Sequence, residues 1–293
     1  MIKGVSKGLI IFAFCIHMLI LAGHVRGEER PISIGILPCT DVVMSFKKFN
    51  PLVTYLEQQT GLYIKLIIPK DLTGLEKAII NGDIDFAFQD PHTYVRLADL
   101  HDKSALIRSL TLNGAAFQSG VVIVRKDSLI RKMEDLKGRT VMFGSRLSTT
   151  KWVAARLLFE EHGIDIDRDL KDYSNGGCCE DIAFNVYLKA VDAGVTCDHF
   201  LESHQEKQQE LGIDPNQIIV IGRTKEVPTR VFAPRKEINK DVITKINRAL
   251  LSLDKKNPAH KKILYCAEIG GFQKSRDEDY NDIRMLIGAK GVE

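Results

Sequence analysis

Three consecutive hydroxyl side chains, Ser148, Thr149 and Thr150, stand where a short strand at Thr140–Phe143 gives way to a helix. The first turn of a helix has backbone N–H groups without intrahelical partners, and the helix dipole favours negative charge there. Two or three hydroxyls in front of these amides provide a pocket for a small tetrahedral oxyanion. The alternative is that Ser148 only caps the helix, as serine does at many helix starts.

The cysteines offer a second kind of chemistry. Five of them follow the first 27 residues: Cys39, Cys178, Cys179, Cys197 and Cys266. We expect a disulfide among Cys178, Cys179 and Cys197, most simply joining Cys197 to one of the neighbouring pair. A thiolate cluster for a soft metal or metalloid and buried thiols are the alternatives. No CxxC pair is present and His199 and His204 have no recognised ligand spacing, so the spacing predicts no metal site and no cofactor.

His92 is a further candidate for an anion site. It follows Asp90-Pro91 at a predicted helix start, from which it could donate a hydrogen bond to an anion. Catalysis has weaker support, because the sequence has no G-x-S-x-G elbow, no HExxH and no P-loop. Ser148 also has no base adjacent in the sequence. We therefore expect a binding protein and not an enzyme.

Length and charge narrow the class of partner. The 293 residues are enough for two domains with a sizeable core. The formal charge is +3, but the first 27 residues contain three basic residues and no acid. The rest of the chain balances 38 Lys and Arg against 38 Asp and Glu. This neutrality argues against nucleic acid or anionic lipid as a bulk partner.

The segment Met1–Gly27 has the pattern of a targeting sequence. Two lysines precede the apolar run Leu9–Ala22, and small residues flank the exit of the segment. The run is shorter than the ~20 apolar residues that span a bilayer. We expect residues 1–27 to be a signal peptide and the body of the protein to be exported. An uncleaved N-terminal membrane anchor is the alternative, because Arg26 makes the cleavage site imperfect.

Strands and helices are predicted to alternate from Ile32 onward. The apolar run Ile32–Leu37 ends at Pro38, as is typical of a buried parallel strand. Further strands are predicted at Ile64–Ile68, Asp85–Gln89, Ala105–Leu112, Gly120–Arg125, Thr140–Phe143, Asp172–Ser174, Ala193–Cys197, Ile218–Gly222 and Arg230–Ala233. Helices fill the intervals, and the chain after Ala233 is predicted to be helical. This alternation is typical of parallel α/β sheets.

In such sheets ligands bind beyond the carboxyl ends of the strands. This rule places Cys39–Asp41, Lys70–Thr73 and Asp90–His92 on one rim.

The two α/β series suggest two lobes. We assign residues 28–119 and 226–293 to the first lobe, which includes a C-terminal helical tail, and residues 120–225 to the second. The chain would cross between the lobes twice, at about Ser119–Val121 and Arg223–Thr229. Two crossings make a hinge, and the cleft beside a hinge is a usual place for a ligand.

Five segments, in this order and spacing, resemble a known family. They are ISIGILPCTD, INGDIDFAFQDPHTYV, GVVIVRKDSLIRKMEDLKGRTVMFGSRLSTT, AVDAGVTCDHF and KEVPTRVFAP. The chain resembles the periplasmic phosphate/phosphite/phosphonate-binding proteins of ABC importers over roughly Pro31 to Ile287. The resemblance implies a type II periplasmic-binding-protein fold: two α/β lobes, mixed sheets flanked by helices and a two-strand hinge. It also implies a cleft that closes on an oxyanion at Ser148, Thr149 and Thr150.

Other positions depart from the family pattern. Where phosphonate-binding members have two tyrosines, this chain has Leu72 or Thr73 and then Phe117. A histidine of the family is replaced by Cys179, and an acid that reads a ligand amine is replaced by Arg230. An arginine adds a bidentate donor for oxyanions and removes the partner of an amine. The resemblance therefore implies a fully anionic ligand, such as phosphate or phosphite, and not an aminoalkyl phosphonate.

Together these observations predict the periplasmic solute-binding component of an ABC importer. Ser148, Thr149 and Thr150 would hold a small oxyanion, with Arg230 and His92 as further donors. The predicted site also includes Thr73, Phe117 and Cys179. The predicted partners are the anion and an ABC permease in the inner membrane, with no nucleic acid, and the protein is expected to be a monomer. The alternatives are a membrane-anchored ligand sensor or partner-presenting protein, and a binder of a soft metal or metalloid oxyanion through cleft cysteines.

Overall fold

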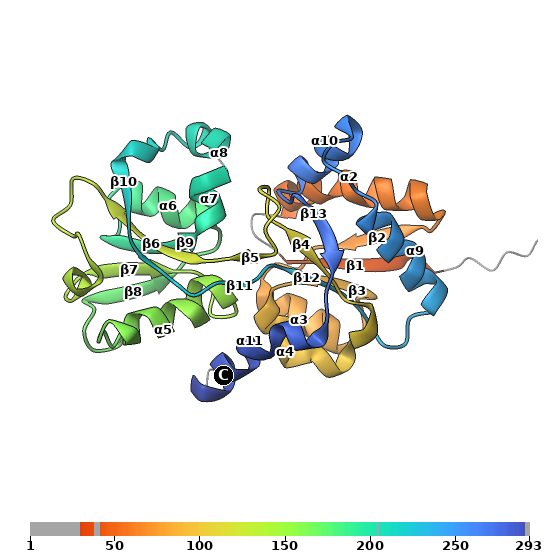
Figure 1. Ribbon diagram of the computed structural model, residues 1–293, viewed down its shortest axis with the longest axis horizontal. Helices are drawn as coiled ribbons and strands as arrows, with labels where there is room; N and C mark the ends of the chain where they lie inside the picture. The colour runs from red at the N-terminus through yellow and green to blue at the C-terminus, as the bar shows by residue number, and fades with distance from the viewer. Residues whose placement is uncertain (1–29, 38–41, 204, 291–293) are drawn as a thin grey trace, which may run out of the picture. The chain divides into compact units, whose positions relative to one another are not determined.

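The computed structural model describes residues 30–37, 42–203 and 205–290 (Figure 1). The predicted targeting segment Met1–Gly27 and the rim segment Cys39–Asp41 lie outside the described residues. Among the residues that are described, no helix combines the length and the apolar character needed to cross a membrane.

The first sheet has six strands in the order β13-β4-β12-β3-β1-β2. Its strands are β1 (Ile32–Ile36), β2 (Ile64–Ile67), β3 (Phe86–Gln89), β4 (Ile107–Leu110), β12 (Val231–Pro234) and β13 (Gly271–Lys274). β1 pairs in parallel with β2 and β3, whereas β12 and β13 run antiparallel to their neighbours. Its helices are α2 (Val42–Thr60), α3 (Leu72–Ile80), α4 (Pro91–Leu97), α9 (Lys240–Leu251) and α10 (Pro258–Cys266).

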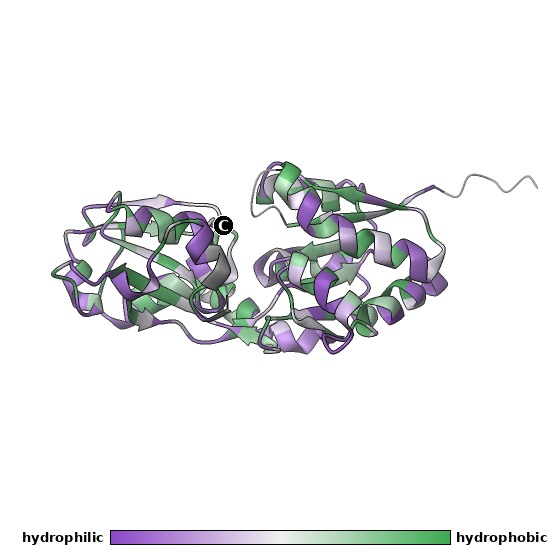
Figure 2. Cartoon of the chain, turned by 90° about the horizontal axis from the view of Figure 1, so that it is seen from above, coloured by the Kyte–Doolittle hydropathy of each residue, from purple (hydrophilic) through white to green (hydrophobic). Residues whose placement is uncertain are grey.

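The core of this sheet forms where α2 and α9 pack on it. Phe49 and Leu56 of α2 and Ile246 of α9 are almost completely buried against strand residues such as Phe88. Figure 2 shows the same division in colour, with hydrophobic strands inside and hydrophilic stretches along the outer faces of the helices. The burial of such side chains stabilises each by roughly 1.5–3 kcal/mol relative to exposure.

The second sheet has five strands in the order β10-β6-β9-β7-β8. They are β6 (Gly120–Arg125), β7 (Thr140–Phe143), β8 (Asp172–Asn175), β9 (Ala193–Cys197) and β10 (Ile218–Arg223). β7 is parallel to β8 and β9, and β6 is antiparallel to β9 and β10. The flanking helices are α5 (Ala154–Glu161), α6 (Cys179–Tyr187), α7 (Asp198–Ser203) and α8 (Gln205–Glu210).

Two short strands join the two sheets. β5 (Phe117–Gln118) precedes β6 and pairs antiparallel with β11 (Val227–Pro228), which follows β10. The C-terminal helix α11 (Asn281–Lys290) contacts α4. Its Leu286 and Ile287 also pack against the hydrophobic core of the second sheet. The helical tail therefore touches elements of both sheets.

The sequence predicted most of these elements but not all of them. The prediction that the chain is helical throughout after Ala233 was wrong, because β13 adds a strand at Gly271–Lys274. β13 is short and its partner β4 lies more than 160 residues earlier, so no local periodicity marks it. Both sheets are mixed, as the family resemblance implied, and not wholly parallel, as the alternation of strands and helices suggested.

Short helical turns complete the chain. They are η1 (Ala98–Leu100), η2 (Lys103–Ala105), η3 (Met133–Leu136), η4 (Thr149–Val153), η5 (Pro215–Gln217) and η6 (Asp277–Tyr280).

A buried carboxylate fixes how β3 lies between β1 and β12. Asp85 is fully buried, and its Oδ2 accepts hydrogen bonds from Ser33 N at 2.8 Å and Ser33 Oγ at 3.0 Å. Asp85 N donates to Ser33 Oγ at 2.9 Å, and Asp85 O accepts from Arg235 N at 2.8 Å. These bonds set the start of β3 and so the place of Asp90 at its end.

We expect Asp85→Ala to lower the free energy of unfolding by about 2–4 kcal/mol, because the partners on Ser33 would stay buried without an acceptor. Urea unfolding followed by circular dichroism measures the change. Asp83→Ala is the matched control, since Asp83 is exposed two residues away and should change stability by less than about 0.5 kcal/mol. Equal effects of the two substitutions would contradict this role of Asp85.

Candidate functional site

A cavity of about 680 Å³ lies at the carboxyl ends of strands from both sheets. Its lining includes Lys70–Thr73 after β2, Asp90 after β3, Ser148, Thr150 and Lys151 after β7, Cys179 after β8, and Cys197 and His199 at and after β9. Lys70–Thr73 and Asp90 therefore lie where the strand-end rule predicts. The segment Cys39–Asp41 of the same predicted rim is outside the described residues.

The helix after β7 begins with an unusually wide turn. Ser148 is its N-cap, and Ser148 Oγ accepts a hydrogen bond from Lys151 N at 3.2 Å. Trp152 N and Val153 N both donate to Ser148 O at 3.1 Å, so the first turn, η4, is a π-turn before α5 begins. Such turns are frequent at functional sites. Ser148 caps the helix as well as lining the cavity, so its two predicted roles coexist.

Thr149 is fully buried and joins the two sheets. Its backbone N donates to Asp90 Oδ1 at 3.0 Å, and its hydroxyl donates to the same oxygen. His92 N donates to Asp90 Oδ1 at 2.9 Å and to Thr149 Oγ1 at 2.8 Å. Asp90 is the N-cap of α4. Its carboxylate accepts the hydrogen bond of the Thr149 amide, so this amide of the predicted anion site is already used within the protein. Thr149 does not line the cavity.

Thr150 and Lys151 do line the cavity. Thr150 Oγ1 accepts from Gln118 Nε2 at 3.0 Å, and Lys151 Nζ donates to Gly177 O at 2.7 Å. A Cβ on residue 144 would lie 2.5 Å from Lys151 Cβ, so any side chain at Gly144 would clash with the side chain of Lys151. Sequence reasoning missed Gln118 and Lys151, although both lie close to residues it named.

Besides Thr149, two predicted site residues, His92 and Phe117, do not line the cavity. The side chain of His92 is buried, and burial lowers its pKa more than the nearby Asp90 raises it. The imidazole is therefore neutral near pH 7 and adds no positive charge to the site. Phe117 is 43% exposed, and its ring stacks under Arg108, whose Cζ lies 5.1 Å from the ring centre.

Arg230 and Thr73 lie on the cavity wall, as predicted. Arg230 Cζ is 5.9 Å from the centre of the Phe88 ring, so the guanidinium makes a cation–π contact with that ring. Glu268, which the sequence did not suggest, also lines the cavity and forms an ion pair with Lys48. Its φ of +53° is rare for a residue other than glycine, and such conformations cluster at functional sites.

The charge of the lining favours an anion. Its basic side chains are Lys70, Arg146, Lys151 and Arg230, and its acidic ones are Asp71, Asp90 and Glu268. Each acid is already engaged within the protein. Asp71 caps α3 through a bond from Gly74 N at 2.7 Å, Asp90 holds Thr149, and Glu268 is paired with a lysine. The helix start at Ser148 adds a further positive potential.

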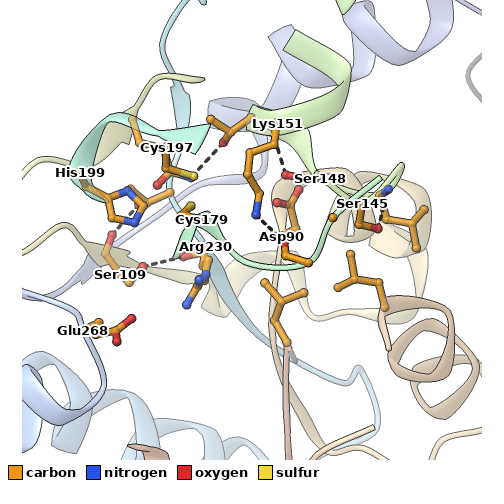
Figure 3. Close-up of a pocket in the computed structure, with 18 of the residues that line it drawn as sticks. Asp90, Ser109, Ser145, Ser148, Lys151, Cys179, Cys197, His199, Arg230 and Glu268 are labelled. Carbon is orange, nitrogen blue, oxygen red and sulfur yellow. Dashed lines mark hydrogen bonds between the residues drawn. The ribbon is translucent and has the colours of Figure 1, made fainter. Parts of the chain in front are cut away.

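Three ligand-type side chains meet on one wall of the cavity (Figure 3). The sulfur atoms of Cys179 and Cys197 and a ring nitrogen of His199 all lie within 4.8 Å of one another. A hydrogen bond with Cys179, together with burial, raises the pKa of the Cys197 thiol, while Lys151 and Arg230 oppose this shift.

The prediction of a disulfide among Cys178, Cys179 and Cys197 was wrong. In the part of the chain that the structure describes, all three are thiols and none is bonded to another sulfur. Cys179 and Cys197 do lie side by side, but they interact as hydrogen-bonded thiols. Cys178 is the N-cap residue of α6 and is buried.

Glu180 follows Cys179 in the first turn of α6. Its environment raises the pKa of its carboxyl to about 7, first because burial disfavours the charged form and then because of Cys179 and Glu268. This carboxyl therefore holds its proton to a higher pH than an exposed glutamate does.

Comparison with known proteins adds three findings. The profile of the family "ABC transporter, phosphonate, periplasmic substrate-binding protein" matches residues 34–280. The "Phosphate-import protein PhnD" of Mycolicibacterium smegmatis is 22% identical over 290 residues, which cover 92% of this chain and 88% of that protein. The "Phosphonates-binding periplasmic protein" of Escherichia coli is 23% identical over 282 residues, covering 93% and 80%.

A solved structure shares the fold. PhnD1 of Prochlorococcus marinus in complex with methylphosphonate superposes with a TM-score of 0.77 at 17% identity, and the match covers 90% of this chain and 99% of that one. The predicted fold class, mixed sheets flanked by helices as in type II periplasmic binding proteins, is confirmed.

The raised pKa of Glu180 predicts a pH dependence of stability. The folded protein binds this proton more tightly than the unfolded chain, whose glutamate has a pKa near 4.5. The bound proton of Glu180 adds roughly 3 kcal/mol to the free energy of unfolding. This stabilisation is fully present below pH 4.5 and is lost as the pH rises through about 7. We expect Glu180→Gln to flatten the unfolding free energy between pH 5 and 8, and Asp181→Asn on the neighbouring exposed position to leave it unchanged. A slope that is the same in all three proteins would refute the assignment.

Proposed function

Because the chain belongs to the family of periplasmic substrate-binding proteins of phosphonate ABC transporters, we propose that its cavity binds a small phosphorus oxyanion through Ser148, Thr150 and Arg230. Members of this family are exported proteins that bind a small ligand and work with the permease of an ABC transporter. They are transport proteins and not enzymes.

One observation carries the proposal: a helix start and a guanidinium face the same cavity. Ser148 and Thr150 come from the end of β7, and Arg230 comes from the segment before β12 in the other sheet. The hydroxyls of Ser148 and Thr150 accept bonds from Lys151 N and Gln118 Nε2, which leaves each hydroxyl proton to be donated to an anion. Arg230 adds a charge-assisted, bidentate donor.

The volume of the cavity supports closure on the ligand. About 680 Å³ is far more than a phosphate or methylphosphonate ion fills, so an anion bound to one wall would stay hydrated on its other side. We propose that residues 28–119 with 226–293 and residues 120–225 act as two lobes. The paired strands β5 and β11 would be the hinge between them.

Asp90 supports a preference among oxyanions. Its carboxylate lies on the cavity wall beside Ser148, where it repels a fully deprotonated anion. A phosphate or phosphonate that carries a P–OH group can donate that proton to Asp90, whereas sulfate has no proton to donate near pH 7. The same carboxylate thus accepts one ligand class and rejects the other.

The relatives agree with a phosphorus oxyanion. One is named for phosphate import and another was solved with methylphosphonate. An aminoalkyl phosphonate fits less well here, because Arg230 stands at the position where the resemblance implies an acid. Glu268 is an acid on the same wall, but its ion pair with Lys48 already neutralises it.

The export route follows from the N-terminal sequence. We propose that Met1–Gly27 is a signal peptide, removed on export, and not a membrane anchor, because its apolar run is shorter than a bilayer span. The mature protein would then act as a monomer that delivers its anion to the permease.

Arg230→Gln and Ser148→Ala test the proposed contacts. Each removes a hydrogen bond to a charged ligand, worth about 1.5–3 kcal/mol, so the Kd for methylphosphonate or phosphate should rise about 10- to 150-fold. Isothermal titration calorimetry measures it. Arg223→Gln is the matched control, since Arg223 pairs with Asp198 and Glu202 away from the cavity and its loss should leave Kd unchanged. An unchanged Kd in both Arg230→Gln and Ser148→Ala would rule out this binding mode.

A panel of anions tests the role proposed for Asp90. At pH 7 we expect phosphate, phosphite or methylphosphonate to raise the Tm of the protein by mass action. Sulfate at equal concentration should give no shift, because it cannot donate a proton to the carboxylate. Differential scanning fluorimetry in a buffer free of oxyanions is the measurement. A sulfate shift as large as that of phosphate would show that Asp90 does not select the ligand.

A further inference from the structure

We propose that Cys179, Cys197 and His199 form a binding site for a thiophilic divalent cation of the Zn²⁺ class, with one coordination position open to the cavity. The site would lie in the wall of the anion cavity and does not depend on which anion that cavity binds. Figure 3 shows the three side chains together, with Arg230 beside them.

The geometry is close to that of a tetrahedral site. Zn–S bonds of about 2.3 Å and Zn–N bonds of about 2.0 Å place tetrahedral ligand atoms roughly 3.5–3.8 Å apart. The two sulfurs and the imidazole nitrogen lie within 4.8 Å of one another. Shifts of about 1 Å or less, within reach of side-chain rotation, would therefore complete the site.

The backbone around the three ligands is held by hydrogen bonds. Cys197 ends β9, which pairs with β6 through the register Gly120 to Cys197. Thr196 Oγ1 donates to Cys179 O at 3.2 Å and ties the start of α6 to β9. Asp198, between Cys197 and His199, accepts a hydrogen bond from Ser119 N on its Oδ2 at 3.0 Å. This bond fixes the start of α7. The ligands thus come from rigid elements, as a preorganised metal site requires.

A metal ion binds the thiolate form of cysteine and displaces the thiol proton. Cys179 is the first residue of α6, where the helix dipole stabilises negative charge. Lys151 and Arg230 also bring positive charge near Cys197, although its burial and its hydrogen bond with Cys179 outweigh them and raise the pKa of its thiol. Two thiolates and a neutral imidazole balance the charge of a divalent cation.

The open fourth position has a consequence for the cavity. Sites with three protein ligands keep the fourth for water or a ligand oxygen. All three residues line the same cavity as Arg230 and Ser148, so a bound cation would present that position to the space where the anion binds.

Co²⁺ is the probe for the test, because tetrahedral thiolate–Co²⁺ complexes absorb in the visible and near-ultraviolet. We expect the purified protein, treated with a chelator and kept in a phosphine reductant, to bind one Co²⁺ with thiolate charge-transfer bands, and Zn²⁺ to displace it. Cys179→Ser, Cys197→Ser and His199→Ala should each remove the tetrahedral spectrum or weaken binding at least tenfold. Cys178→Ser is the matched control, because Cys178 neighbours Cys179 but does not belong to the cluster, and it should bind as the unaltered protein does.

Circular dichroism and the Tm of each variant establish that it is folded. The absence of stoichiometric Co²⁺ binding in the unaltered protein would overturn the proposal, as would binding that survives both Cys179→Ser and Cys197→Ser. A phosphate or methylphosphonate Tm shift in the metal-free protein tests the anion function separately, so the failure of one proposal is distinguishable from the failure of the other.

Discussion

The hydrogen bonds between Asp90 and Thr149 are the constraint on which the site depends. A single carboxylate oxygen accepts from the backbone and hydroxyl of Thr149 and from His92 N, all of them buried. These bonds join the end of β3 in the first sheet to the helix start after β7 in the second. A buried carboxylate satisfied in this way is costly to disturb, since each lost partner leaves a polar group unsatisfied. The place of the anion wall relative to Arg230 follows from this link.

In the proposed binding mode, the carboxylate of Asp90 also limits which anions bind. Helix start, Arg230 and the surplus of basic side chains all attract an anion, whereas Asp90 opposes one that has no proton. Attraction by charge alone would accept sulfate and phosphate alike, so discrimination must come from a hydrogen-bond donor on the ligand. In this proposed binding mode, one side chain both selects the ligand and links the two sheets.

The sequence predicted the regular elements well, because the apolar runs of β1, β6, β7 and β9 carry their own periodicity. It did not predict β13, whose pairing with β4 is a long-range contact. For the site, the strand-end rule found the rim, but it could not tell that Thr149 and His92 turn inward to Asp90. Sequence spacing also did not predict that His199 lies beside Cys179. Their proximity depends on how α6 and α7 pack on β9, which no local pattern shows.

The central claim is that a phosphorus oxyanion binds at the helix start together with Arg230. A crystal structure with methylphosphonate bound tests it most directly. We expect phosphonate oxygens about 2.7–3.1 Å from Ser148 Oγ, Thr150 Oγ1 and the Arg230 guanidinium, with one protonated oxygen donating to Asp90. Methylphosphonate bound elsewhere in the cavity, with none of these contacts, would contradict this binding mode.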